Sequence, residues 1–428
     1  MRKPVLKDAG HQLVAAVEVT QCQLTSHLIS RLIYQPICVR FHVDAPLSTQ
    51  VVPVSKCISR FPGDILSSLG RVVRCLWVVL GLVSVLQEVS AQAQVSLPCG
   101  YDDKTCAIGA LRGHTAQKIA FWKQAFSKPL GERIGTAPLE LIEWAGLKNI
   151  QEGFPHKPTA TNLEPAFLRD VHDALLELPQ KVLGSISTKL AGIYMVDDLG
   201  GTGMSPAIED EEGNQIAGVV VLDRSVLVQY TANAWATWKE RTPFKPGPTT
   251  TLTTEIETAV QDTRKNAIQY ILLHELGHVF SKGGDAHPPW NTPPKEDQPT
   301  DAYPFFQLSW FISSGDRRYV TKFDGLFPER KDVVYYLRAK LSAEQMLDTY
   351  SKLEDTNFST LYSVTHPFDD FAEAFANYVH VVLMKKPFKV RIFQRGKLAK
   401  EYGPCWEERR CAEKRRLLET MLDRNNGR

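Results

Sequence analysis

The chain has 428 residues, of which 43% are apolar, and it carries 50 Lys and Arg against 48 Asp and Glu. This composition is typical of a globular protein and excludes a fibrous, collagen-like or wholly disordered chain. The net charge of +2 is too small to favour nucleic acid or an anionic membrane surface as a partner.

Residues 1–70 show no sustained helical or alternating pattern. We interpret them as an upstream extension that is disordered or results from a misassigned start. The alternative is a genuine but poorly structured leader. N-terminal sequencing of the exported protein would decide between the two.

A segment with the pattern of a secretory signal follows. Arg71 and Arg74 precede the uncharged run 75–86, and Ala91-Gln92-Ala93 comes shortly after it. A basic region, an apolar region and a small-x-small cleavage site are the three parts of a signal peptide. The run is too short to cross a bilayer, which takes roughly 20 apolar residues. We therefore predict a signal peptide at 71–93 and an exported protein, periplasmic or extracellular, without a stable membrane span. The alternative is a buried core helix or strand.

Cleavage after Ala93 would leave 335 residues with 41 basic and 43 acidic side chains, a net charge of −2. Four of the eight cysteines would remain, near the two ends of that chain: Cys99, Cys106, Cys405 and Cys411. In an exported protein they predict two disulfides with three possible connectivities, of which the local pairs are favoured. The second local pair requires the last helix to begin after Cys405, because an unbroken helix would hold its α-carbons about 9 Å apart.

Helical and strand patterns alternate along the rest of the chain, which predicts the α+β class. The apolar, β-branched runs 192–197 and 216–223 predict two strands, joined through a turn at 210–214 as a possible long hairpin. The region 94–185 is predicted to be helical. Helices are predicted at 114–127, 137–147, from Pro165 to about 178, and at 266–280, 342–354, 368–384 and 406–424.

The helix predicted over 266–280 holds His274, Glu275 and His278. Its apolar residues recur at i, i+3, i+4 and i+8, so one side of the helix should be buried. The two histidines are four residues apart, which places both rings on one face where they can share a cation. Zinc suits imidazole ligands, and Glu275 can reach the open coordination position of such a metal without being a ligand. The alternative is a pair of surface histidines.

A catalytic zinc site needs a third protein ligand. Glu373 is the best candidate, because it lies in a predicted apolar helix between alanines that would let another helix approach closely. A buried carboxylate needs a partner, and a metal would supply one. Asp369 or Asp370 can cap the start of that helix. Asp285 and Asp301 are alternative ligands, and a glutamate favoured only by the helix dipole is the structural alternative.

The segment His274-Glu275-Leu276-Gly277-His278 resembles the zincin metallopeptidases, whose active-site helix carries His-Glu-x-x-His. Ser281 and Gly284 depart from the metzincin extension and exclude that group. The run 371–375, Phe-Ala-Glu-Ala-Phe, resembles the second-ligand helix of the gluzincins, in particular the anthrax lethal factor type peptidases.

This resemblance implies that His274, His278 and Glu373 hold one catalytic zinc ion and that Glu275 is the general base. It also implies that Asn377 orients a histidine ligand. The implied fold is a zincin-like domain over 186–428 with a small mixed sheet.

The implied activity is that of an exported zinc metallopeptidase acting on peptide or protein substrates. By their positions alone, Tyr362 and His366 are candidate oxyanion donors. The predicted strand 216–223 is a candidate edge strand that pairs with extended substrate. The alternatives are an exported zinc-stabilised binding protein and a host-directed effector of zincin fold without general protease activity.

Overall fold

The computed structural model describes residues 15–19, 39–43, 95–289 and 300–425. The chain divides into two units, residues 1–91 and 92–428. In the first unit the described residues are two antiparallel strands, β1 (Ala15–Val19) and β2 (Val39–Val43). The signal peptide predicted at 71–93 lies outside the described residues.

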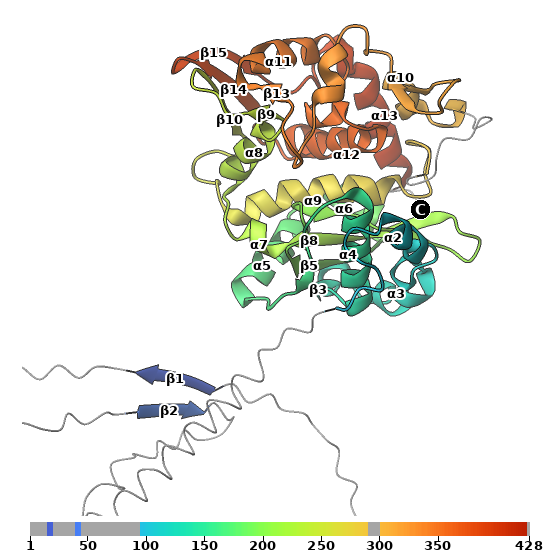
Figure 1. Cartoon of the computed structure of the whole chain (residues 1–428), viewed down its shortest axis with the longest axis vertical. Helices are drawn as coiled ribbons and strands as arrows, with labels where there is room; N and C mark the ends of the chain where they lie inside the picture. The colour runs from blue at the N-terminus through green and yellow to red at the C-terminus, as the bar shows by residue number, and fades with distance from the viewer. Residues whose placement is uncertain (1–14, 20–38, 44–94, 290–299, 426–428) are drawn as a thin grey trace, which may run out of the picture. The chain divides into compact units, whose positions relative to one another are not determined.

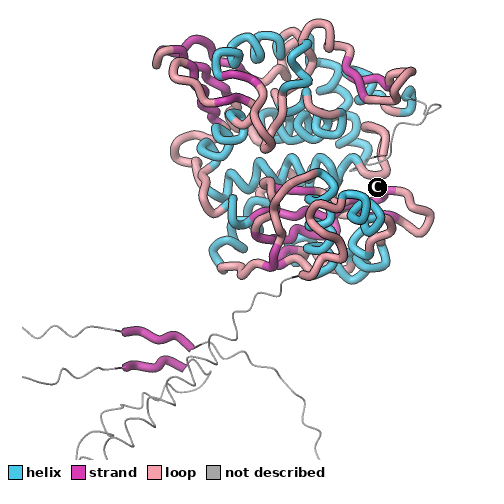
Figure 2. Tube along the Cα trace, in the orientation of Figure 1, coloured by secondary structure: helices cyan, strands magenta, loops and turns pink. Residues whose placement is uncertain are grey.

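A mixed sheet forms the N-terminal half of the second unit (Figures 1 and 2). Its strands are β3 (Ile134–Thr136), β4 (Thr159–Ala160), β5 (Leu190–Asp197), β6 (Gly203–Met204), β7 (Ala207–Glu209) and β8 (Gln215–Asp223). The two long strands, β5 and β8, are parallel to each other, and β3 is parallel to β5. β4 pairs antiparallel with β5, and β6 and β7 pair antiparallel with β8.

Helices cover both faces of this sheet. The helices of this half are α2 (Lys104–Leu111), α3 (Ile119–Phe126), α4 (Leu139–Glu152), α5 (Pro165–Leu176), α6 (Gln180–Ile186), α7 (Arg224–Leu227) and α9 (Arg264–Ser281). Helix α8 (Ala232–Arg241) packs instead against α9 and strand β10 (Thr250–Glu255). Val220 and Leu222 of β8 belong to the core that includes α5, α6 and α9, whereas Val219 and Val221 face the core of α3 and α4. Burial on both faces explains the unbroken apolar run of this strand.

The C-terminal half packs on the other side of α9, with α12 running alongside it (Figure 1). Its helices are α10 (Pro304–Ser309), α11 (Met346–Glu354), α12 (Pro367–Tyr378) and α13 (Ala412–Asn425). Its strands are β11 (Trp310–Ile312), β12 (Tyr319–Thr321), β13 (Leu341–Ser342), β14 (Lys389–Gln394) and β15 (Lys397–Tyr402), together with β9 (Phe244–Lys245) and β10 (Thr250–Glu255). β10, β14 and β15 form an antiparallel sheet. The two halves beside α9 therefore differ in their sheets, one mixed and the other antiparallel.

The structure confirms the α+β class but changes how the predicted pieces fit together. The strands predicted at 192–197 and 216–223 exist as β5 and β8, but they are parallel neighbours rather than a hairpin. The turn at 210–214 instead joins β7 to β8, and Asp210 accepts a hydrogen bond from the Asn214 backbone within it. The predicted helical region 94–185 also contains β3 and β4, which join the sheet. It therefore shares one compact unit with the residues after 186.

The local disulfide pairs are confirmed. Cys99 bonds to Cys106 and Cys405 to Cys411, with α-carbons 5.7 Å apart in each pair. The last helix, α13, begins at Ala412, after both cysteines of the second pair. Among the described residues, no helix combines the length and apolar character that a bilayer span requires.

Candidate metal centre

Helix α9 carries the two histidines at the junction of the halves. Thr263 caps its start by accepting a hydrogen bond from the Asn266 backbone, and the chain leaves the helix after Ser281. His274 and His278 share one face, as their spacing predicted, and their Nε2 atoms lie 3.2 Å apart. His278 is 3% exposed, so the pair is largely withdrawn from solvent.

Helix α12 brings acidic residues to this pair. Pro367 occupies its first turn, where the missing N–H costs nothing, and Asp369 and Asp370 lie in the same turn, where the helix dipole favours negative charge. The two helices approach closely at Gly277, where an added Cβ would lie 2.8 Å from the Ala372 Cα. A glycine in α9 and an alanine in α12 therefore permit the contact that brings these acids to the histidines.

Asp369, rather than Glu373, is the carboxylate that joins the two histidines. Its Oδ1 atom lies 3.7 Å from His278 Nε2 and 4.0 Å from His274 Nε2. Together the three residues offer ligand atoms that all lie within 4.8 Å of one another. Among the described residues, the group that could hold a metal ion therefore contains Asp369 and not the predicted Glu373.

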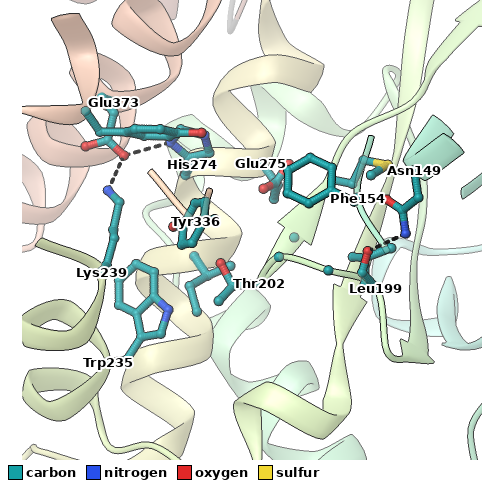
Figure 3. Close-up of a pocket in the computed structure, with 16 residues that line it drawn as sticks. Asn149, Phe154, Leu199, Thr202, Trp235, Lys239, His274, Glu275, Tyr336 and Glu373 are labelled. Atoms are coloured by element: carbon teal, nitrogen blue, oxygen red, sulfur yellow. Dashed lines mark hydrogen bonds and ion pairs between the residues drawn. The ribbon is translucent and has the colours of Figure 1, made fainter. Parts of the chain in front are cut away.

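Glu373 instead contacts the outer nitrogen of His274. Its Oε1 atom lies 2.9 Å from His274 Nδ1 and 2.8 Å from Lys239 Nζ, as Figure 3 shows. Its Oε2 atom accepts a 2.6 Å hydrogen bond from Thr360 Oγ1. Asp369 and Glu373 are one helical turn apart on the same face, so the sequence placed either of them near the histidines. Which of the two acids lies near Nε2 of His274 and which lies near Nδ1 depends on how deeply α12 packs against α9. No local pattern in the sequence encodes this depth.

The other candidate acids lie elsewhere. Asp285 pairs with Arg424, 3.0 Å away, and Asp301 is an exposed residue of a short 3₁₀ segment. Asn377, expected to orient a histidine ligand, accepts a hydrogen bond from Trp406 Nε1 and donates to the Tyr270 hydroxyl. Glu373 therefore contacts His274, whereas these hydrogen bonds of Asn377 go to other residues.

Glu275 lies beside the histidines and is 5% exposed. Its carboxylate accepts a 2.6 Å hydrogen bond from Ser205 Oγ, which fixes one of its oxygens. Gly203 of β6 passes so close that an added Cβ would lie 2.6 Å from Glu275 Oε1. No local pattern in the sequence linked Ser205 or Gly203 to the histidines.

Burial dominates the protonation behaviour of these groups. It raises the pKa of Glu275 above its ordinary value and raises that of Asp369 to about 6, although the charge of His274 opposes both shifts. It lowers the pKa of His278 well below its ordinary value, which keeps that imidazole neutral. Burial also opposes ionisation of Glu373, but Lys239 and His274 hold its pKa well below the usual range. Burial would lower the pKa of His274 as well, but the contact with Glu373 raises it overall.

A cleft opens over these residues. One part is lined by Trp235, Lys239, Tyr336, Phe154 and residues 199–204, and the other by Trp144, Lys282, Tyr319, Phe368 and residues 203–207. Both parts include His274, Glu275 and Tyr362, and the second part, of about 560 Å³, also includes His366. Ligand pockets commonly enclose some 300–1,000 Å³. The two positional candidates Tyr362 and His366 therefore both face the cleft.

The edge strand beside α9 is not the one predicted. Strand β8, which contains 216–223, lies between β5 on one side and β6 and β7 on the other, so neighbouring strands already pair with its backbone. The segment 203–209, which contains β6 and β7, forms the edge and lines the cleft. These strands are two and three residues long, too short to show an alternating pattern in the sequence.

The residues fit a zinc ion. Two nitrogen ligands of a tetrahedral zinc, each at about 2.0–2.1 Å from the metal, lie about 3.3 Å apart. The two Nε2 atoms are 3.2 Å apart, and a small inward shift of Asp369 would complete a His₂–carboxylate set. Neutral imidazoles and a carboxylate are ligands that zinc accepts, and catalytic zinc sites commonly use three protein ligands.

No protein family model, curated protein sequence or solved structure matches the chain.

Proposed function

We propose that this protein is a zinc-dependent peptidase whose metal is held by His274, His278 and Asp369. One observation carries the proposal: two imidazole Nε2 atoms 3.2 Å apart share a site with one carboxylate, while a second, Glu275, lies beside them in the same cleft. The His-Glu-x-x-His sequence on α9 supports it through its resemblance to the zincins.

Each residue has a distinct task in this proposal. When bound, zinc supplies Lewis-acid activation of a water molecule and of the scissile carbonyl. Glu275 accepts a proton from the attacking water and returns it to the leaving amine. Ser205 keeps the Glu275 carboxylate in one orientation through its hydrogen bond. Tyr362 or His366 donates a hydrogen bond to the oxyanion, because both side chains face the cleft.

The proposed substrate is an extended peptide. The edge formed by 203–209 lines the cleft on the side of Glu275, and such an edge can add a peptide as a further strand. Backbone hydrogen bonds of this kind tolerate many side chains, so affinity would come from the main chain and selectivity from the two parts of the cleft.

Export is part of the proposal. Two disulfides persist most readily in oxidising compartments, and the segment 71–93 has the pattern of a signal peptide. N-terminal sequencing of the exported protein should find a terminus at Gln94. A terminus well before that residue would contradict the proposed signal.

The test compares zinc content and peptide hydrolysis for the wild type and Glu275→Gln. We expect the variant to retain zinc and to lose hydrolysis by roughly 10²–10⁴-fold, since a general base contributes about that much. Glu413→Gln, at an exposed glutamate on α13, is the matched control and should behave as the wild type. Unchanged hydrolysis in Glu275→Gln would reject the assignment of Glu275. A wild type that binds zinc without cleaving any peptide would favour the binding-protein alternative.

A further inference from the structure

Lys239 is a buried lysine directly behind the metal centre. It belongs to α8, and its side chain is 5% exposed. Its ammonium group lies 2.8 Å from Glu373 Oε1 and 4.7 Å from the centre of the Tyr362 ring. Burying a lysine is costly unless its charge is paired, so this arrangement calls for an account of what Lys239 does.

The same oxygen of Glu373 contacts both Lys239 and a proposed ligand. Oε1 lies 2.9 Å from His274 Nδ1 as well as 2.8 Å from the lysine, and Thr360 binds the other oxygen. The carboxylate is therefore fixed at both oxygens by Lys239 and Thr360, and it lies against the His274 imidazole. In Figure 3, Lys239, Glu373 and His274 follow one another in this order.

Glu240, the neighbouring acid, does not compete strongly for the lysine. Its Oε1 atom lies 3.8 Å from Lys239 Nζ, beyond hydrogen-bond distance. Its Oε2 atom accepts hydrogen bonds of 3.0 Å and 2.7 Å from the hydroxyl groups of Tyr335 and Tyr350. The shortest contact that Lys239 makes with an acid is therefore the one with Glu373.

We infer that Lys239 is a positioning residue, which anchors Glu373 so that His274 presents Nε2 toward His278 and Asp369. The inference rests on the proposed function, because it concerns the same metal centre. Contacts one step removed from a metal typically change its affinity by 10–100-fold when they are lost. Lys239 lies one contact further away, but it holds the oxygen that touches the ligand.

The test measures metal affinity rather than catalysis. Zinc affinity is determined by competition with a chelator, and cobalt(II) is added to read the ligand geometry from its visible absorption. Lys239→Met should weaken zinc binding by about 10-fold or more and should alter the cobalt spectrum, whereas Lys239→Arg should restore most of the affinity. Lys414→Met is the matched control, since Lys414 is fully buried and pairs with Asp370 on α12 without contacting a proposed ligand.

A double variant keeps the test decisive if Lys239→Met does not fold. Glu373→Gln and Lys239→Met/Glu373→Gln should bind zinc with nearly equal affinity, because Lys239 acts through the carboxylate that both lack. A further 10-fold loss in the double variant would overturn the inference. So would unchanged or tighter binding in Lys239→Met, a failure of Lys239→Arg to restore affinity, or an equal loss in Lys414→Met. A wild type that binds neither zinc nor cobalt would instead reject the proposed metal centre.

Discussion

Gly203 offers a direct test of where the proposed base must sit. A Cβ added at this position would lie 2.6 Å from Glu275 Oε1 and 2.9 Å from its Cδ and Cγ atoms. Ordinary contacts begin near 3.4 Å, so Gly203→Ala requires a displacement of about 0.8 Å. The backbone of β6 is paired with β8, whereas the Glu275 side chain can rotate, so the carboxylate should be the part that moves.

A displacement of this size has a predictable cost. Misplacing a reacting group by about 1 Å can lower a rate by about 10²-fold. Gly203→Ala should therefore lower kcat by about 10–100-fold, or about 1.4–2.7 kcal/mol in activation free energy. Zinc affinity should not change, because the three heavy atoms nearest the added Cβ all belong to Glu275, which is not a proposed ligand.

The assay is peptide hydrolysis combined with chelator competition for zinc. Gly201→Ala is the matched control from the same loop. The heavy atom nearest the added Cβ would be Gly203 O, 3.9 Å away, so this variant should keep wild-type kcat. Full activity in Gly203→Ala would show that Glu275 need not occupy the position described. An equal loss in both variants would indicate a general effect on the loop rather than a displaced base.

Three further predictions test the ligand set, the disulfide and one ion pair. Asp369→Ala should weaken zinc binding by more than ~100-fold, beyond the range for indirect contacts, and retention of full affinity would reject it as a ligand. Replacing Cys405 and Cys411 by serine should lower the free energy of unfolding by about 2 kcal/mol in chemical denaturation, and no loss would argue against the bond. Burial opposes ionisation of Asp324, but Arg330 holds the pKa of this carboxyl below its ordinary value. The ion pair therefore stabilises the fold above the unfolded-state pKa of about 3.9, and this stabilisation is lost as pH falls through the folded pKa. Asp324→Asn should thus cost about 1 kcal/mol at pH 7 and progressively less as pH falls through the folded pKa, and a cost that does not change with pH would contradict this reasoning.

The histidine pair could be predicted because its geometry is local. The apolar stripe of α9 and the four-residue spacing of His274 and His278 are both properties of one helix. The strands β5 and β8, the local disulfides and the existence of α4, α5, α9 and α12 depended in the same way on short-range patterns, whereas α2, α6, α8 and α10 were not predicted. The predicted features therefore followed from the sequence without knowledge of the packing.

The rest of the site depends on packing between distant segments. Asp369 and Glu373 share one face of α12, and the choice between them depends on the close contact of Gly277 with Ala372. Lys239 reaches Glu373 from 134 residues away, and no periodicity links the two. The order of strands in the sheet was misjudged for a similar reason, because apolar character does not specify which neighbour a strand adopts.

A structural ion-pair cluster is the alternative to the proposed metal centre at α9. A structural cluster would place charged imidazolium groups between the acids, and each histidine would then be a donor at both nitrogens. His274 fits that description in part, because its contact with Glu373 raises its pKa against the effect of burial, whereas burial holds the pKa of His278 well below its ordinary value and keeps that ring neutral. Glu373 Oε1 lies 2.9 Å from His274 Nδ1, while Nε2 of that ring lies 3.2 Å from Nε2 of His278. A neutral His278 ring beside a second imidazole and a carboxylate supports the proposed cation, because neutral imidazole is the form that binds a metal.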